Sequence, residues 1–241
     1  MFNLRDAHRI WAGSALLVVL LVLYSCGAEA TADQAVVLER REAPTAAPVL
    51  QESSSNFDYY VLALSWSPQH CATPAGRRDT MQCAGPRPYG FIVHGLWHQY
   101  ERGWPADCDS PHRLEMDVTK SVMDIMPSER LIQHEWRKHG TCSGYPAKDY
   151  FALARKAYEA FKAPPAYGSP RSEVYVSPAR YKKAVLEANP QLREKGVAVV
   201  CSGRFLQEVR VCLDKNLQPR DCGQGVRDTC SAKEIIVRPL R

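Results

Sequence analysis

Cysteine is the residue type that most constrains how this chain can fold. The sequence of 241 residues contains nine cysteines, and all but Cys26 lie between positions 71 and 230. An even set of this size predicts a domain stapled by disulfides, which form and persist in oxidising compartments. A zinc site made of cysteines is not favoured, because no two of them form a Cys-x-x-Cys pair. The set consists of Cys71, Cys83, Cys108, Cys142, Cys201, Cys212, Cys222 and Cys230.

The first thirty residues have the pattern of a signal peptide. Arg5 and Arg9 precede an apolar run over residues 11–24, and the small-residue site Ala28-Glu29-Ala30 follows it. This run is too short to favour a membrane-spanning helix. Cys26 leaves a second interpretation open, in which the chain is processed as a lipoprotein and Cys26 is lipidated. Both routes predict a secreted or periplasmic protein, and only lipidation would attach it to a membrane.

The composition changes after the leader. Residues 31–55 are rich in Ala, Pro and Ser without periodicity, which predicts a flexible tether. Residues 56–241 remain for one globular domain, and an apolar content of 45% in the whole chain allows a substantial core. The formal net charge of +5 suits a polyanionic partner but does not identify one.

Segments of strand and helix character predict an α+β domain. Aromatic and branched residues predict strands at 59–64 and 91–97, and further strands are expected at 197–201, 206–213 and 235–237. Helices are expected at 117–126, 128–139, 148–162 and 178–188, with Ser128 and Ser177 as N-caps of the second and the last. Together these segments predict a central, mostly antiparallel sheet with flanking helices, in a disulfide-stapled single domain.

The polar residues from His134 to His139 are the strongest chemical signal. At 100° per residue of helix, His134, Lys138, Glu135 and His139 share an arc of about 140°, whereas Trp136 points away from it, as a core residue would. A charged arc on a helix is more often a solvent-exposed face than a chemical site. Two histidines, a carboxylate and a lysine so close together, followed at once by Cys142, nevertheless favour a chemical site on an anchored helix.

A zinc hydrolase site is the first alternative to test, because His134-Glu135 begins like the motif His-Glu-x-x-His. The second histidine here is five residues away instead of four, which places it about 140° around the helix. Lys138, a cation between the two histidines, would also repel a divalent ion. We therefore expect no metal ion and no other cofactor.

Histidine pairs suit another reaction, the transfer of a phosphoryl group from a 5′-oxygen to a neighbouring 2′-hydroxyl. One group must remove a proton and another must donate one near neutral or mildly acidic pH. A cation must also hold the phosphate while its charge redistributes. The expected partner of the helical histidines is His94, in the segment 91–97.

Two segments resemble the signature motifs of the ribonuclease T2 family. They are His94-Gly95-Leu96-Trp97 and the sequence His-Glu-Trp-x-Lys-His-Gly-Thr-Cys at 134–142. The resemblance runs from about Phe57 to the C-terminus, and includes the segments 62–68, 189–192 and 208–214. It implies a metal-independent endoribonuclease that cleaves single-stranded RNA with low base specificity. Cleavage would give a 2′,3′-cyclic phosphate and then, by hydrolysis, a 3′-phosphate.

The same resemblance gives each polar residue of the two motifs a role. His139 would be the general base on the 2′-hydroxyl, and His94 the general acid on the leaving 5′-oxygen. Glu135 and Lys138 would stabilise the transition state, and His134 would hold the phosphate.

Three further residues are implied in binding the bases. Trp97 lines a base pocket in the family, although alternation along a regular strand places it on the face opposite His94. Trp104 resembles the second aromatic residue of this pocket. Gln99 stands where some relatives carry aspartate, which leaves the base preference open. Stacking on aromatic rings tolerates different bases, in line with weak base specificity.

The chain departs from the family at His98, where a proline usually follows the first motif. In a regular strand His98 would share a face with His94, and an exposed position at the strand end is expected for it. His70 and His112 have no identifiable partners, and no role is expected for them.

The resemblance also implies the disulfide pairing, because eight cysteines alone allow 105 arrangements. The implied pairs are Cys71 with Cys83, Cys108 with Cys142, Cys201 with Cys230, and Cys212 with Cys222.

RNA is the expected partner of this chain, which is expected to be a monomer without an obligatory protein partner. The alternative from another functional class is a catalytically inactive relative that binds RNA or serves for storage. Such a protein could lose His94 or His139 and keep its disulfides, so the presence of both histidines argues against it.

Overall fold

A computed structural model of the chain describes residues 56–109 and 113–240. The predicted signal peptide and tether lie outside the described residues, as do Cys26 and His112. Within the described ranges, every helix is too short or too polar to cross a membrane.

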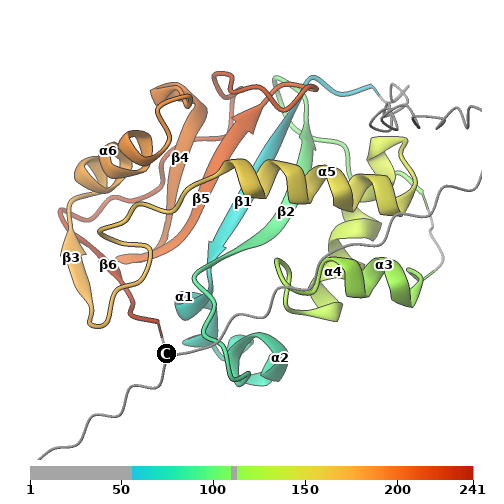
Figure 1. Cartoon of the computed structure of the whole chain (residues 1–241). Coiled ribbons are helices and arrows are strands. Elements are labelled where there is room, and N and C mark those ends of the chain that lie inside the picture. Colours follow the sequence, from blue (N-terminus) through green and yellow to red (C-terminus); the bar gives the residue numbers. More distant parts are fainter. Residues whose placement is uncertain (1–55, 110–112, 241) are drawn as a thin grey trace, which may run out of the picture. The chain divides into compact units, whose positions relative to one another are not determined.

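Six strands form one sheet at the centre of the domain (Figure 1). Its order is β2 (Phe91–Gln99), β1 (Tyr59–Trp66), β5 (Phe205–Leu213), β6 (Ile235–Val237) and β3 (Val174–Val176), while β4 (Val197–Ser202) pairs with β5. All neighbouring strands are antiparallel except β5 and β6, which are parallel. The predicted α+β class with a mostly antiparallel sheet is therefore confirmed.

Helices surround this sheet. They are α1 (Ser67–Cys71), α2 (Thr80–Cys83), α3 (Met116–Ser121), α4 (Glu129–Lys138), α5 (Ala147–Ala160) and α6 (Pro178–Ala188), with short 3-10 turns at Gly76–Arg78, Gly140–Ser143 and Glu194–Gly196. Ser177 caps α6 as predicted, since its hydroxyl accepts a hydrogen bond from the Arg180 backbone. Ser128 occupies the N-cap of α4, but its side chain makes no capping bond. The sequence did not predict α1, α2 or β3.

The main core lies between the sheet and α5, which crosses one face of it (Figure 1). Leu62 and Leu64 of β1 point into this core and are at most 1% exposed, as are Tyr150 and Phe151 of α5. Burying side chains of this size contributes about 1.5 to 3 kcal/mol each. Because one face of the sheet is used in this way, polar side chains of the strands can gather on the other.

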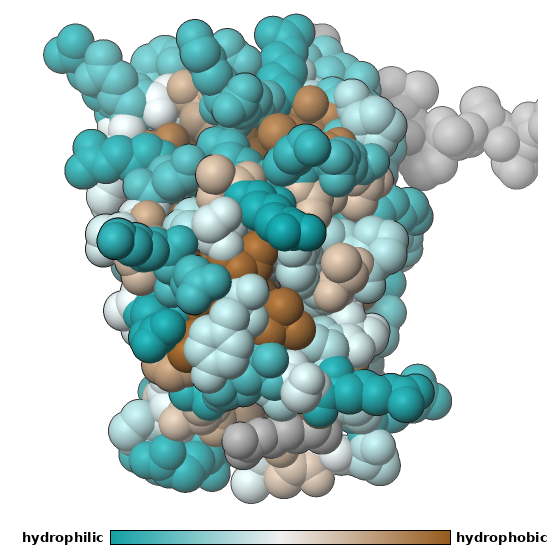
Figure 2. Space-filling view, turned by 90° about the vertical axis from the view of Figure 1, so that its left-hand side faces the viewer, coloured by the Kyte–Doolittle hydropathy of each residue, from teal (hydrophilic) through white to brown (hydrophobic). Residues whose placement is uncertain are grey.

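The end of the domain that carries α6, β3 and β6 faces solvent. Hydrophilic side chains cover most of it, and apolar ones show between them near its middle (Figure 2). Tyr175 of β3 is 54% exposed, and the guanidinium of Arg204 lies 5.9 Å from the centre of its ring.

Four disulfides join Cys71 to Cys83, Cys108 to Cys142, Cys201 to Cys230, and Cys212 to Cys222. This pairing agrees with the one implied by the family resemblance. The bridge between Cys108 and Cys142 joins the loop after β2 to the turn after α4. The two histidine motifs lie on β2 and at the end of α4, so this bridge ties their neighbourhoods together.

Candidate active site

A β-bulge at His94 determines which side chains of β2 reach the site. Ala63 of β1 pairs with Gly95, and the next residue, Leu64, pairs with Val93. His94 is therefore an extra residue between two paired ones. An extra residue in one strand inverts the alternation of its side chains beyond that point.

This inversion corrects two expectations about β2. Trp97 does not lie opposite His94, because the bulge returns it to the same face, where the two rings are 5.2 Å apart. His98 does not share a face with His94 and is not exposed. It is fully buried on the core side, where its ring contacts those of Phe57 and Tyr60 at 4.6 and 4.9 Å. Burial, together with the nearby positive charge of His139, lowers the pKa of His98 to about 3.

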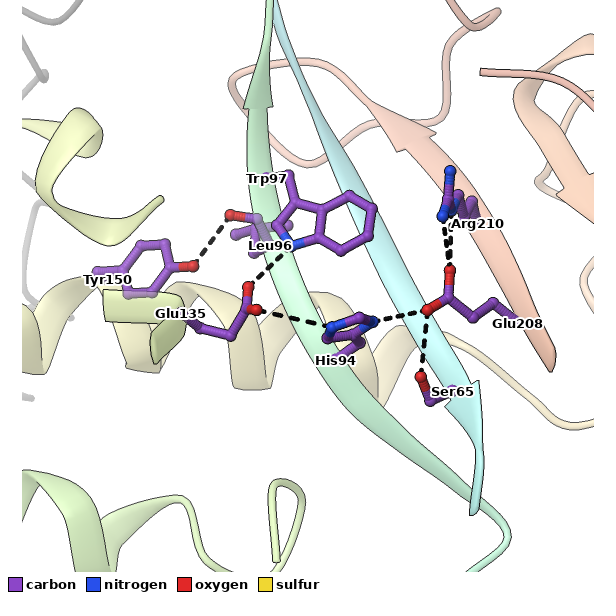
Figure 3. A network of polar contacts seen from close by, with 8 residues as sticks. All are labelled: Ser65, His94, Leu96, Trp97, Glu135, Tyr150, Glu208 and Arg210. Atoms are coloured by element: carbon purple, nitrogen blue, oxygen red, sulfur yellow. Dashed lines mark hydrogen bonds and ion pairs between the residues drawn. The ribbon is translucent and has the colours of Figure 1, made fainter. Parts of the chain in front are cut away.

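Glu208 of β5 holds the His94 ring from one side (Figure 3). Its Oε1 lies 2.6 Å from Nδ1 of His94 and accepts a hydrogen bond from Ser65 at 3.3 Å. Its Oε2 accepts two bonds from the guanidinium of Arg210, at 2.9 and 2.8 Å. Burial alone would raise the pKa of Glu208, but the hydrogen bond to His94 and the charges of His94 and Arg210 lower it to about 2. Glu208 is therefore a buried anion.

The anion on one side of His94 makes its imidazole more basic. Burial would lower the pKa of His94, but the hydrogen bond to Glu208 and the charges of Glu208 and Glu135 outweigh burial and raise it. With Nδ1 bound to Glu208, the proton that a substrate could receive is on Nε2. This atom lies 3.7 Å from Oε1 of Glu135, and a third of the His94 side chain is exposed.

Glu135 of α4 lies on the other side of His94 and is 1% exposed. Its Oε2 accepts a hydrogen bond of 2.8 Å from the Trp97 indole (Figure 3). Burial raises the pKa of Glu135 to about 7, because His94, Trp97 and Lys138 only partly offset it. Gly95 makes this approach possible, since a Cβ at that position would collide with Oε2 of Glu135 and with the Trp97 ring.

His139 follows the last residue of α4, and its backbone N donates to Glu135 O at 2.9 Å. Its ring is 5.5 Å from that of Trp97, so the Trp97 ring lies next to both His94 and His139. Burial and the positive charges of Lys138, His134 and His94 lower the pKa of His139 to about 4. The two imidazoles are thus shifted apart, His94 toward the protonated form and His139 toward the neutral one, as an acid and base pair requires.

His134 and Lys138 complete the group on α4. His134 is exposed, and its pKa is lowered by partial burial and by the charge of Lys138. Lys138 is half-buried and adds positive charge beside Glu135 and His139. The fold therefore brings the five catalytic candidates of the two motifs into one electrostatically coupled group.

The base-binding candidates are placed less uniformly. Trp97 is half-buried in the site, with the Arg210 guanidinium 5.0 Å from its ring centre. Trp104 is 61% exposed in the loop after β2. Gln99 is 8% exposed, and its amide donates to the backbone O of His98. In the described part of the chain, no hydrogen bond, ion pair or ring contact joins Trp104 or Gln99 to His94 or His139.

Trp136 lies away from the polar arc as predicted. Its ring contacts those of Tyr150 and Phe151 at 5.8 and 6.4 Å, and it packs against the main core.

Two cavities open beside this group. A small one of about 200 Å³ is lined by His94, Glu208 and Ser65, among others. A larger groove of about 1130 Å³ is lined by His134 and by residues of α2 and α4.

Sequence reasoning missed Ser65, Glu208 and Arg210 as members of the site. A signal was present, because Glu208 and Arg210 interrupt the apolar strand β5 at alternate positions and so share one of its faces. Their partner could not be read from the sequence, since 114 residues separate His94 from Glu208.

In the ranges 56–109 and 113–240, no three His, Cys, Asp or Glu side chains group in a way that could hold a metal ion. The site's positive charge comes from Lys138, Arg210 and the histidines.

Comparison with known proteins gives consistent relatives. The model of the ribonuclease T2 family matches residues 57–222. A ribonuclease of Aeromonas hydrophila is 37% identical over 202 residues, which cover 78% of this chain and 88% of that protein. The structure of RNase NT in complex with 5′-AMP is similar at a TM-score of 0.60 and 25% identity, covering 77% of this chain and 100% of that one. An RNase-related protein from Calystegia sepium shares the fold at a TM-score of 0.62 and 22% identity, over 76% and 98% of the two chains. The chain belongs to the ribonuclease T2 family.

Proposed function

We propose that this T2-type endoribonuclease cleaves single-stranded RNA through a 2′,3′-cyclic phosphate, with His139 as general base and His94 as general acid. The observation that carries the assignment is the opposite pKa shift of the two imidazoles. At mildly acidic pH His139 is a free base and His94 keeps its proton. The similar structure of RNase NT holds 5′-AMP, which supports a nucleotide as the ligand class.

In the first step His139 removes the proton of the 2′-hydroxyl, and the 2′-oxygen attacks the adjacent phosphorus. The bond from phosphorus to the 5′-oxygen breaks, and Nε2 of His94 gives its proton to that oxygen. In the second step water takes the place of the 5′-hydroxyl. His94 then removes the proton of this water, and His139 returns its proton to the 2′-oxygen, which leaves a 3′-phosphate.

The remaining polar groups stabilise negative charge on the phosphoryl oxygens in the transition state. Lys138 supplies a positive charge, and His134 binds the phosphate from the exposed side of α4. Glu135, partly protonated near pH 7, donates a hydrogen bond to a phosphoryl oxygen when it carries a proton. Trp97 offers a ring for a base next to both histidines.

The decisive experiment compares RNA with a substrate whose leaving group is activated. His94→Ala and His139→Ala should each lower the rate on RNA by about 10² to 10⁴. On the activated substrate, which needs no acid in the first step, His94→Ala should recover much of its rate and His139→Ala should not. Rescue of His139→Ala alone would reverse the two roles, and full activity of both variants on RNA would refute the site.

The pH dependence of kcat/KM for wild-type enzyme is a second test. The rate should rise as His139 loses its proton near pH 4, and it should fall as His94 loses its proton above its ordinary value of 6.5. The two limbs belong to the coupled pair and not to either residue alone. Full activity should persist in excess chelator, since histidines and lysine supply the charges of the mechanism. Loss in chelator that zinc or magnesium reverses would contradict the metal-independent mechanism.

We also propose that the enzyme is exported and acts as a monomer without an obligatory protein partner. Four disulfides are typical of proteins that fold in oxidising compartments. The finer alternatives are cleavage after residue 30 and lipidation of Cys26, and mass determination of the mature N-terminus separates them.

A further inference from the structure

The groove beside the catalytic group is larger than a dinucleotide site requires. Its volume of about 1130 Å³ exceeds the roughly 300 to 1,000 Å³ of pockets that hold small ligands. It begins at His134 and runs between α4 and the segment from Ala75 to Met81. Its lining includes the apolar side chains of Leu131, Met81 and Trp136.

The groove adjoins the cavity that His94 lines. His70, Asp79 and Leu131 line both hollows, so these residues form the wall between them. The groove is therefore the next hollow that a chain bound beside His94 meets.

The charges on the groove lining are predominantly positive. Arg78, Arg130 and Arg137 line it and are exposed, and within the described residues no hydrogen bond or ion pair engages their guanidinium groups. Arg113 also lines it, but it is paired with Glu129. The other carboxylate, Asp79, lies 3.5 Å from Nε2 of His70. Three cations of the lining thus have no anionic partner in the part of the chain that the structure describes.

Two of these cations continue the catalytic face of α4. At 100° per residue, Arg130 and Arg137 lie about 40° and 60° from His134 around the helix. Seven residues of helix separate them by about 10 Å along the axis. A row of positive charge therefore leads away from the catalytic group along one side of the groove, with Arg78 opposite on the segment before α2.

We propose that this groove binds the sugar-phosphate backbone of RNA nucleotides beyond the two that flank the scissile bond. The inference rests on the proposed function, and it adds that the enzyme prefers long single strands to dinucleotides. A positively charged groove with apolar and aromatic surface is the usual combination for single-stranded nucleic acid. Guanidinium groups suit it because they bind phosphate through paired hydrogen bonds.

The test is the double variant Arg78→Gln/Arg130→Gln, which removes one charge from each side of the groove. Arg137 is kept, because its charge acts on His134. The control, Arg180→Gln/Arg193→Gln, removes two exposed arginines on and after α6, at the other end of the sheet (Figure 1). Both proteins are assayed on a dinucleoside monophosphate and on a long unstructured RNA.

We expect the groove variant to lose about three- to tenfold in kcat/KM on long RNA and less than twofold on the dinucleoside. The slope of log kcat/KM on long RNA against log salt should become shallower by about 1.4, or about 0.7 for each phosphate that the variant no longer binds. The control should match wild type in both assays. Equal losses of the groove variant on the two substrates, or a result equal to that of the control on long RNA, would overturn the proposal.

A binding assay separates this proposal from the proposed reaction. Single-stranded DNA has no 2′-hydroxyl, so it cannot be cleaved through a cyclic phosphate. Anisotropy of a labelled DNA strand should show weaker binding to the groove variant than to wild type and the control. Unchanged binding would refute the groove even if catalysis is as proposed, whereas weaker binding supports it even if wild type proves unable to cleave RNA.

Discussion

Two buried glutamates, on either side of His94, differ in their ionisation because their partners differ. Glu208 receives two bonds from Arg210 and one from His94, which hold its pKa near 2. Glu135 receives one indole bond, and no arginine among the described residues binds it, so burial raises its pKa to about 7. Glu208 can act as a permanent anion that orients His94, the proposed general acid, and favours its protonated form. Glu135 can exchange a proton during the reaction.

Glu208→Gln should change the acidity of His94 while leaving a similar acceptor at its Nδ1. The loss of the anion next to His94 should lower its pKa, so the basic limb of the kcat/KM profile should move to lower pH. The rate at the optimum should fall by about tenfold or more, and NMR titration of His94 should show the same shift. A profile with unchanged limbs would mean that Glu208 serves only the packing of β5.

His98 is a residue at which acid should destabilise the fold. Its pKa is about 3 in the folded protein and about 6.5 in an unfolded chain, so the unfolded chain takes up this proton first as the pH falls. The stability due to neutral His98 is complete above pH 6.5 and is lost progressively toward pH 3.

His98→Leu, which is similar in size and cannot be protonated, should flatten this dependence. As the pH falls from 6.5 to 3, the free energy of unfolding of this variant should decrease less steeply than that of wild type. The difference between the two slopes should be up to about 1.4 kcal/mol per pH unit. Urea unfolding at several pH values measures it. Parallel curves for the two proteins would show that His98 is not kept neutral by the fold.

At the scale of elements, the bulge in β2 is the feature on which the site depends. It turns both His94 and Trp97 to the face opposite α5, and Gly95 within it leaves room for the Glu135 carboxylate. Without the extra residue, the side chains on one side of the bulge would change faces.

Gly95→Ala should therefore disable the enzyme without unfolding it. The new Cβ would displace the Glu135 carboxylate and the Trp97 ring. We expect kcat/KM to fall by about 10² or more, because misplacement by about 1 Å has this effect on catalysis. Gly90→Ala, at the residue before β2, is the control, since its Cβ would meet its nearest neighbours, Gly168 and Trp66, at 3.4 Å. Equal activity of the two variants would contradict this account.

The bulge also explains what the sequence could and could not predict. The long strands, α4 to α6 and the two histidine motifs follow from periodicity, caps and resemblance. Periodicity assumes a regular strand, so it assigned Trp97 and His98 to the wrong faces. Periodicity also cannot predict that Glu208 lies next to His94, because the pairing of distant strands depends on the assembled sheet. The three-residue strand β3 was too short to show a pattern.

At the scale of the whole molecule, the disulfide from Cys108 to Cys142 joins the two parts of the active site. It spans 34 residues, and in the chain-entropy model a loop of this length stabilises the fold by about 3 to 4 kcal/mol. The double variant Cys108→Ser/Cys142→Ser should lose about that much free energy of unfolding, as measured by urea titration. It should also lose activity before it unfolds, since the position of His139 relative to His94 is no longer fixed. A variant that keeps full stability would show that the sheet and core alone hold α4 in place.

The same bridge has a consequence for how the enzyme withstands proteases. Any peptide bond cut between residues 109 and 141 lies inside the ring that Cys108 and Cys142 close. The two fragments remain joined by a covalent bond, and both histidine motifs stay in one molecule. A nuclease of this design can therefore be nicked in that stretch, which includes all of α3 and α4, and still keep the two histidine motifs together until the disulfide is reduced.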